Sequence, residues 1–242
     1  MRVAGRAAAQ VLEKVASLIR PGITTGEVDQ AAADFMVQLG AKSAFLGYRG
    51  FPGHICISMN EEVVHGIGGT RRIQYADIVK LDIGVIVEGW VGDTALTVPV
   101  GAIDPSVQRL LTVTEAALYK AIPFATDGRH LGDLCSAIED EVVANGYSVV
   151  REFVGHGVGR KLHEEPQVPN FGRKGTGPRL KAGMVIAIEP MVNMGGSGVK
   201  ILEDGWTVVT QDRKPSAHYE HSVLVTKGEP EILTWREVTQ LK

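Results

Sequence analysis

The feature that most constrains this chain is a pair of β-branched runs separated by two turn residues. Residues 78–87 and 90–98 are rich in Val, Ile and Thr, and Glu88-Gly89 lies between them. Such runs around a two-residue turn predict an antiparallel hairpin. Side chains alternate between the two faces of a strand, so this pairing puts Asp82 and Asp93 on one face. The hairpin therefore brings two carboxylates into one small volume.

Two neighbouring carboxylates need a shared proton or a cation, because like charges a few ångströms apart strongly raise one pKa. Downstream lie His156, Glu189 at the end of the apolar run 184–188, and Glu220 at the head of another run. A charge in such a run is costly to bury unless it is paired or metal-bound. Singly, each residue also fits a structural role. Together with the two aspartates they favour a two-metal site, because imidazole and carboxylate suit Zn, Fe, Mn or Co.

Three glycines surround the histidine in Gly155-His156-Gly157-Val158-Gly159. Glycine lets backbone segments approach closely, and we expect this imidazole to lie in an unusual turn. His163 follows in an HEEP segment, but Gln167 stands where a zincin helix needs its second histidine. The chain also lacks GxSxG, Walker and CxxC motifs, so the sequence does not predict a serine hydrolase, a nucleotide-binding or a thiol-redox protein.

Charge and cysteine usage indicate where the protein works. The net charge of -3 predicts neither a nucleic-acid stripe nor a polybasic membrane patch. The two cysteines, Cys56 and Cys135, indicate a reducing compartment. Residues 1–22 have the pattern of an amphipathic domain helix and not of a signal peptide, and no apolar run reaches roughly 18 residues. We expect a soluble, cytoplasmic protein with no nucleic-acid or membrane partner.

Helices and antiparallel strands alternate in blocks, which predicts an α+β fold. Thr24 to Glu27 form a capping box for a helix to about Gly40, and Asp104-Pro105 opens a third helix. A similar turn-and-helix unit recurs at 123–146. We interpret residues 1–242 as one catalytic domain built by duplication, with halves of roughly 1–100 and 101–242. Further strands are predicted at 54–59, 148–154, 184–193, 207–210 and 219–226, and an exposed loop at 172–181.

Long motifs in one order carry a family resemblance: HGIGG at 65–69, LDIGV, GDTALT, GHGVGRKLHEEPQVPN, IEPMVN, DGWTVVT and YEHSVLVT. They span nearly the whole chain, which resembles a type I methionine aminopeptidase. The resemblance implies the pita-bread α+β fold, with two pseudo-twofold-related αβ halves and a central antiparallel sheet. It also implies removal of N-terminal methionine from nascent proteins and peptides when the second residue is small, by attack of a metal-bridging hydroxide on the first peptide bond.

The resemblance assigns the ligands of two divalent ions (Co, Mn, Fe, Zn or Ni) to Asp82, Asp93, His156, Glu189 and Glu220. Asp93 and Glu220 would bridge both ions, and Glu189 would also carry a proton to the leaving amine. His163 would stabilise the oxyanion, and His65 would hydrogen-bond the substrate peptide. In this family a monovalent ion, Na or K, is often held by backbone oxygens, which here lie near Asn60, Glu62 and Ser216.

The resemblance also implies a slot for the methionine side chain, walled by Phe45, Tyr48, Phe51, Cys56, Leu162 and Trp206. Each of these residues also fits an ordinary core position. Phe51 and Leu162 depart from the commoner family pattern of Tyr and Phe, which leaves the strictness of the slot open. The implied partners are the N-termini of nascent polypeptides, met by a monomer during transient ribosome contact.

Two other functions fit the same motifs. A proline-specific peptidase of this fold would use the same five ligands, but such relatives carry a large extra N-terminal domain, for which we expect no room here. A catalytically inactive binding module would have lost ligands, and all five are present. A type II aminopeptidase would carry a long insertion, whereas only 30 residues separate Glu189 from Glu220.

Overall fold

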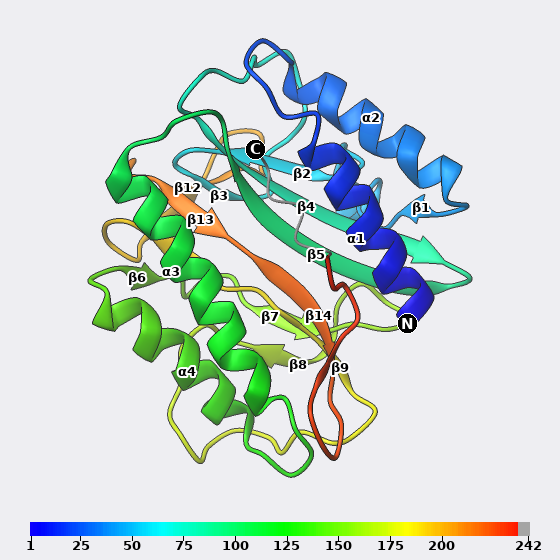
Figure 1. The fold of residues 1–242 in the computed structure, drawn as a ribbon, viewed down its shortest axis with the longest axis vertical. Helices are drawn as coiled ribbons and strands as arrows, with labels where there is room; N and C mark the ends of the chain where they lie inside the picture. The colour runs from blue at the N-terminus through cyan, green and yellow to red at the C-terminus, as the bar shows by residue number, and fades with distance from the viewer. Residues whose placement is uncertain (237–242) are drawn as a thin grey trace.

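The computed structural model describes residues 1–236, and a nine-stranded sheet with antiparallel pairing lies at its centre (Figure 1). The main path of the sheet is β1 (Lys42–Ser43), β4 (Ile78–Val87), β5 (Trp90–Pro99), β14 (Glu220–Leu224), β9 (Val185–Ile188), β7 (Gly155–Gly157) and β8 (Glu164–Val168). In addition, β2 (Cys56–Met59) pairs with β4, and β15 (Glu231–Ile232) pairs with β14. The predicted α+β fold with a central antiparallel sheet is confirmed.

Two smaller sheets flank the central one. The first has the order β13 (Ser216–His218), β10 (Met191–Asn193) and β6 (Ser148–Val149). The second has the order β11 (Val199–Ile201), β12 (Val208–Thr210) and β3 (Glu62–Val64). Both draw strands from distant parts of the chain, so they tie the segments around the central sheet together.

The predicted hairpin is confirmed, with β5 one residue longer than the predicted strand 90–98. Val87 pairs with Trp90, which leaves Glu88 and Gly89 as the two-residue turn. Their φ angles are 50° and 74°, in the left-handed region that a type I′ turn needs at both central positions. Asp82 pairs with Ala95, and residues two apart on a strand share a face. Asp82 and Asp93 therefore point to the same side of the sheet.

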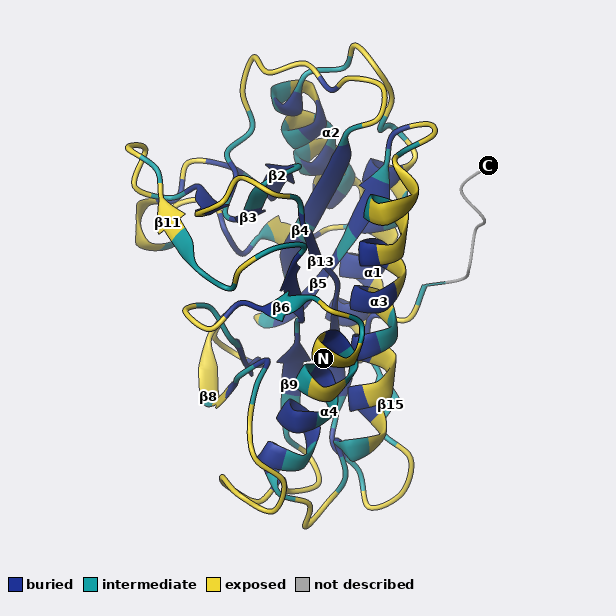
Figure 2. Ribbon diagram, turned by 90° about the vertical axis from the view of Figure 1, so that its left-hand side faces the viewer, coloured by how far each residue is buried: buried dark blue, intermediate teal, exposed yellow. Residues whose placement is uncertain are grey.

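Four long helices, α1 (Arg2–Ala16), α2 (Thr25–Gln38), α3 (Pro105–Ala121) and α4 (Leu131–Ala144), cover one face of the central sheet. Short 3-10 turns, η1 (Tyr48–Gly50) and η2 (Ile122–Phe124), complete the helical set. Odd-numbered residues of β4, such as Leu81 and Ile83, pack in one core with α1 and α2. Val223 of β14 packs with α3 and α4. Figure 2 shows β8 and β11 on the other side of the sheet, away from α1 and α3.

The predicted helix starts are confirmed by their hydrogen bonds. Thr24 Oγ1 accepts the Glu27 N–H at 3.1 Å, and Glu27 Oε2 accepts the Thr24 N–H at 2.8 Å. These two bonds form the reciprocal capping box and satisfy donors that a helix N-terminus leaves free. Asp104 Oδ1 accepts the Ser106 N–H at 2.7 Å and caps α3. No helix within residues 1–236 is long and apolar enough to span a bilayer.

Two strand predictions are wrong in extent. The single strand expected at 184–193 is two strands in different sheets, because Pro190 lacks the N–H that would continue the ladder. β9 therefore ends at Ile188, and Glu189 directly follows its carboxyl end. The strand expected at 148–154 ends at Val149.

The turn expected around His156 is also wrong, because this residue is the middle of strand β7. The flanking glycines serve close strand packing. A Cβ added at Gly155 would lie 2.3 Å from the Ala187 carbonyl oxygen, and one at Gly157 would lie 2.2 Å from that of Glu165. Both contacts are too short for any side chain, so glycine lets β7 fit between β8 and β9.

Candidate metal centre

The hairpin and strand β14 place three carboxylates on the face of the sheet that the helices leave free. Ala95 of β5 pairs with Asp82 of β4 on one side and with Glu220 of β14 on the other. Directly paired residues share a face, and so do residues two apart on one strand. Asp82, Asp93 and Glu220 therefore point the same way, although Glu220 is more than a hundred residues further along the chain.

Strands β9 and β7 extend this row by two side chains. Ala187 of β9 pairs with Ser222 of β14 and with His156 of β7. Because Ser222 and Glu220 share a face, His156 and Glu189 lie on that face as well. The predicted ligands thus lie on, or for Glu189 directly after, five adjacent strands and form one row: Asp82, Asp93, Glu220, Glu189 and His156.

The row is compact enough for metal ions. One ligand atom from each of Asp93, His156 and Glu220 can be chosen so that all three lie within 4.8 Å of one another. His156 Nε2 lies 3.7 Å from Asp93 Oδ2 and 3.5 Å from Glu189 Oε1. These separations are too long for direct hydrogen bonds. An ion placed between the atoms could bind each of them as a ligand.

Burial and mutual repulsion disfavour ionisation of the four carboxyl groups. Burial raises the pKa of Asp82 and of Glu189 to about 7. The pKa values of Asp93 and Glu220 are raised well above their ordinary values, first by burial and then by neighbouring carboxylates. Bound cations would reverse these shifts, because an opposite charge nearby favours the ionised form.

Polar atoms without partners show that the donor set fits metal ions. Within the described residues, Asp93 Oδ1 and Glu220 Oε1 are buried and accept no hydrogen bond. His156 Nδ1 lies 2.9 Å from the carbonyl oxygen of Gly157, which can only accept, so Nδ1 carries the proton. The lone pair of Nε2 is then free to face the carboxylates, as in a metal-binding histidine with its second nitrogen fixed.

Two further histidines lie beside this row. The ring centroids of His163 and His156 are 4.2 Å apart, and His163 Nδ1 lies 2.9 Å from the Tyr48 hydroxyl. His65 lies against Phe153, with ring centroids 5.4 Å apart. Burial lowers the pKa of His65 to about 4 and also lowers that of His163. Both imidazoles are therefore neutral at pH 7.

A cavity of about 290 Å³ opens at the row and is apolar on one side. Phe51 and Trp206 meet edge to face there, with ring centroids 5.1 Å apart. Cys56 stands opposite Asp82 in the β2–β4 pair, and burial raises the pKa of its thiol well above the ordinary value. The cavity brings together every predicted wall residue: Phe45, Tyr48, Phe51, Cys56, Leu162 and Trp206. The other cysteine, Cys135, is buried in the core around α4.

The sequence interpretation missed His218, which lies beside the row. This side chain is only 1% exposed, and its Nε2 is 3.6 Å from Glu189 Oε2. A histidine two positions before a predicted ligand was the available signal.

The backbone oxygens predicted to hold a monovalent ion already have a cationic neighbour. Lys80 Nζ donates to the Asn60 carbonyl oxygen at 2.7 Å and to that of Ser216 at 2.9 Å. Glu62, the third predicted residue, turns its side chain to Arg71 at 2.7 Å. This donor set does not fit a free monovalent ion, because the Lys80 ammonium group already donates to two of its oxygens.

Sequence comparisons place this geometry among known proteins. The sequence model of "Metallopeptidase family M24" matches residues 1–227. The methionine aminopeptidase of Clostridium perfringens is 50% identical over 234 residues, which are 97% of this chain and 94% of the relative. Methionine aminopeptidase 1 of Bacillus subtilis is also 50% identical over 234 residues, with the same shares covered.

Solved structures agree with the sequence comparisons. The crystal structure of methionine aminopeptidase from Thermotoga maritima superposes with a TM-score of 0.96 at 44% identity and covers 98% of this chain and 95% of its own. A prolidase from Pyrococcus furiosus gives a TM-score of 0.78 at 23% identity and covers 98% of this chain but 63% of its own. The second likeness shows a shared fold only.

Proposed function

Because the chain belongs to metallopeptidase family M24, we propose that its row of five ligands makes it a metal-dependent aminopeptidase that removes N-terminal methionine. The observation that carries this proposal is the row itself, in which side chains from five adjacent strands converge beside an apolar cavity. The high identity to methionine aminopeptidases over nearly the whole chain supports the same activity.

Two divalent ions would be held by this row. Asp93 and Glu220, each of which has a buried oxygen without another partner within the described residues, would be shared by both ions. Asp82 would complete one ion, and His156 with Glu189 would complete the other. When bound, such a pair of ions acidifies a water molecule and polarises the scissile carbonyl. Four carboxylates and one imidazole suit Mn, Fe, Co, Zn or Ni, and four negative charges balance two divalent ions.

The histidines beside the row act on the substrate. The Tyr48 hydroxyl lies 2.9 Å from His163 Nδ1, and in the tautomer in which this hydroxyl donates to Nδ1, the proton of the imidazole is on Nε2 and makes that atom a donor. His163 then donates to the oxygen that becomes negative as the peptide carbon turns tetrahedral. Glu189 transfers a proton from the attacking water to the leaving amine, because a carboxylate beside that water can accept the proton and then donate it. His65 hydrogen-bonds the substrate peptide.

The apolar side of the cavity selects the first side chain. Phe51, Cys56, Leu162 and Trp206 line it without a charge, so an unbranched thioether fits better than a charged side chain. A bulky second residue would crowd the entrance and push the carbonyl away from its attack position. Small second residues are therefore preferred.

The cellular setting completes the proposal. The substrates are the N-termini of nascent polypeptides, which the protein meets in the cytoplasm as a monomer during transient contact with the ribosome. The bound metal is one of the five divalent ions named above. The division into duplicated halves of roughly 1–100 and 101–242 stays part of this proposal.

The test is release of the first residue from Met-Ala-Ser and from Ala-Pro-Ser after chelation and return of each divalent ion. We expect metal-dependent release of methionine from Met-Ala-Ser and little release from Ala-Pro-Ser. Asp93→Asn should abolish release, whereas Asp29→Asn should retain it, because Asp29 pairs with His54 outside the row. Preferential cleavage of Ala-Pro-Ser would instead assign the protein to proline-specific peptidases. Full activity of Asp93→Asn with saturating metal would reject the two-metal site.

A further inference from the structure

Lys80 is an unusual residue for its position in the sheet. It lies in the apolar strand β4, two residues before Asp82, and is 1% exposed. Complete burial of a lysine is costly unless its donors are satisfied. Its Nζ donates to the backbone oxygens of Asn60 at 2.7 Å and of Ser216 at 2.9 Å. The ammonium group is thus held by carbonyl oxygens, which is also how proteins hold monovalent cations.

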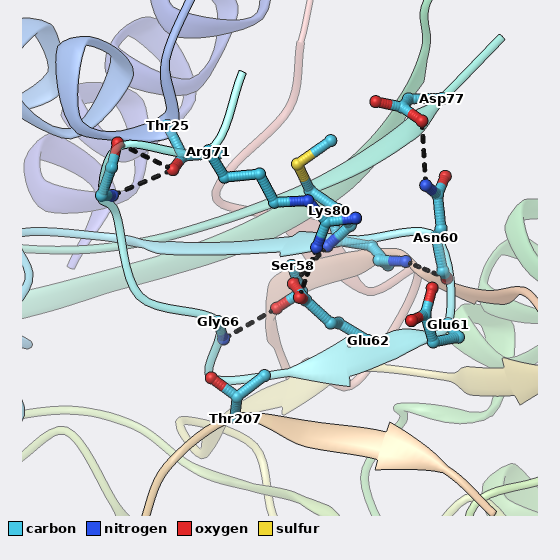
Figure 3. A network of polar contacts seen from close by, with 12 residues as sticks. Thr25, Ser58, Asn60, Glu61, Glu62, Gly66, Arg71, Asp77, Lys80 and Thr207 are labelled. Carbon is cyan, nitrogen blue, oxygen red and sulfur yellow. Dashed lines mark hydrogen bonds and ion pairs between the residues drawn. The ribbon is translucent and has the colours of Figure 1, made fainter. Parts of the chain in front are cut away.

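The carboxylates around Lys80 are engaged elsewhere. Glu62 accepts from Arg71 and from the Met59 N–H, each at 2.7 Å, and Asp77 accepts from the Asn60 amide at 2.9 Å. Figure 3 shows Glu62 turned to Arg71, while Lys80 reaches the Asn60 backbone. Within the described residues, no carboxylate oxygen lies within 4.0 Å of Lys80 Nζ. Nearby acidic groups therefore supply a negative field, and carbonyls supply the contacts.

The two carbonyls link Lys80 to the strands that carry ligands. The Asn60 carbonyl also accepts the Ser216 N–H at 3.0 Å. Hydrogen bonds therefore join Asn60, Ser216 and Lys80 pairwise. Ser216 begins β13, which leads through His218 to Glu220 at the start of β14. Lys80 shares a face of β4 with Asp82. One ammonium group thus fixes the strand of Asp82 relative to the segment that delivers Glu220.

We propose that Lys80 is a built-in cation that replaces a free monovalent ion at the Asn60 and Ser216 carbonyls and positions Asp82 and Glu220. The two acceptor carbonyls, 2.7 and 2.9 Å from Nζ, favour the charged form of the side chain, and the nearby carboxylates of Glu62, Glu61 and Asp77 act in the same direction. Lys80 touches no reacting atom, so it is a positioning residue. Only the activity readout below rests on the proposed function.

The first test uses the wild-type protein loaded with its divalent ion. Its melting temperature and rate of methionine release are measured in NaCl, KCl and choline chloride at one ionic strength, about 0.15 M. We expect the same values in all three salts, because Lys80 already contacts the two carbonyls and leaves no place for Na⁺ or K⁺. Choline is the reference, because it is too large to bind there. A melting temperature or rate that rises in NaCl or KCl relative to choline chloride would overturn the proposal. This test does not depend on whether any variant folds.

The second test compares Lys80→Ala, which opens space at the two carbonyls, with Lys80→Met, which fills most of that space without a charge. In choline chloride, both should lose on the order of 10- to 100-fold in kcat/KM, as for a lost contact behind a metal ligand. NaCl, KCl or ammonium chloride should restore the kcat/KM of Lys80→Ala but not that of Lys80→Met. An ion that raises the folded-to-unfolded ratio about tenfold should raise the melting temperature of Lys80→Ala by roughly 3 to 6 °C.

The matched control is Lys42→Ala, which removes an exposed lysine from the neighbouring strand β1. It should respond to none of the salts. A Lys80→Ala protein whose melting temperature is the same in every salt, or a Lys80→Met protein that is restored equally, would contradict the built-in cation. If no variant or wild-type protein releases methionine, the melting temperatures still decide this proposal and the failure falls on the proposed function.

Discussion

The imidazole of His218 faces the carboxylate of Glu189, with 3.6 Å between Nε2 and Oε2. The other carboxylate oxygen lies 3.5 Å from His156 Nε2, so two imidazoles bracket Glu189. Within residues 1–236, neither ring nitrogen of His218 has a hydrogen-bond partner. Burial lowers the pKa of His218 to about 4, so it is neutral at pH 7. A small rotation would let its N–H donate to Glu189 and fix the orientation of that carboxylate.

The first prediction follows from this contact. His218→Ala should weaken divalent-metal binding by about 10- to 100-fold, the usual effect of losing a partner of a metal ligand. Titration of metal into the chelated protein, followed by calorimetry, measures the change. His130→Ala is the control, because His130 contacts the Gly177 carbonyl in another part of the chain. Metal affinity equal to wild type would remove His218 from the support of Glu189.

The second prediction separates His163 from the ligands. His163→Ala should lower kcat by about 100-fold or more, the order for losing one oxyanion donor, while metal content stays near wild type. Tyr48→Phe should lower kcat less, because it removes the hydroxyl contact to His163 Nδ1 but leaves the His163 imidazole in place. Kinetics and metal analysis on the same samples provide the comparison. Metal loss as large as that of His156→Ala would make His163 a ligand instead.

The third prediction concerns pH and metal removal. In the metal-free protein the pKa of Asp82 rises from 3.8 to about 7, and that of Glu189 from 4.5 to about 7. The folded protein then binds more protons than the unfolded chain between about pH 4 and pH 7, so its stability falls as pH rises through that window. The loss is at most about 1.4 kcal/mol per pH unit for each group.

Bound metal removes this loss, because the ligands are already deprotonated. The difference in melting temperature between loaded and chelated protein should therefore grow from about pH 5 to about pH 8. Buried neutral histidines such as His221 act in the opposite direction at acidic pH, but they contribute to both samples and cancel in the difference. A difference that stays constant or shrinks over this range would contradict the clustering of carboxylates.

The fourth prediction concerns the slot. Leu162 is 6% exposed and lies in the apolar cluster with Phe51 and Val158. Leu162→Phe adds volume to this wall, so it should lower kcat/KM for ethionine-Ala relative to Met-Ala by about tenfold, the worth of one extra methylene in a tight pocket. Val143→Phe is the control, because Val143 is exposed on α4 and the added volume meets no wall of the slot. Leu118→Phe would not serve, because Leu118 is fully buried and the change would overpack the core. An unchanged ratio would place Leu162 outside the slot.

How much the sequence predicts depends on how local each feature is. The shared face of Asp82 and Asp93 follows from alternation and a two-residue turn, both visible within 22 residues of sequence, 78–99. The position of His156 in a strand does not, because β7 has three residues, two of them glycine, and exists only through its pairing with β8 and β9. Long-range pairing decides such short strands.

Lys80 and His218 show the same limit for the site. Lys80 lies within an apolar strand, and its partners are Asn60 and Ser216, at sequence separations of 20 and 136 residues. No local pattern indicates that two carbonyls will meet there. His218 lies two residues before Glu220, but the break at Tyr219 between β13 and β14 interrupts simple alternation. Family motifs predict the ligands and leave these two neighbouring residues unmarked.

The place of β14 has a consequence for how the protein is made. This strand comes after every other strand of the main path in the sequence, yet it lies between β5 and β9. Until residue 224 is synthesised, the two halves of the sheet have no strand to join them, and β5 and β9 each present an open edge that can pair with other chains. The last strand therefore closes the sheet. A product truncated before Glu220 lacks a predicted ligand and also exposes two unpaired strand edges, so we expect early termination to yield aggregation instead of a weaker enzyme.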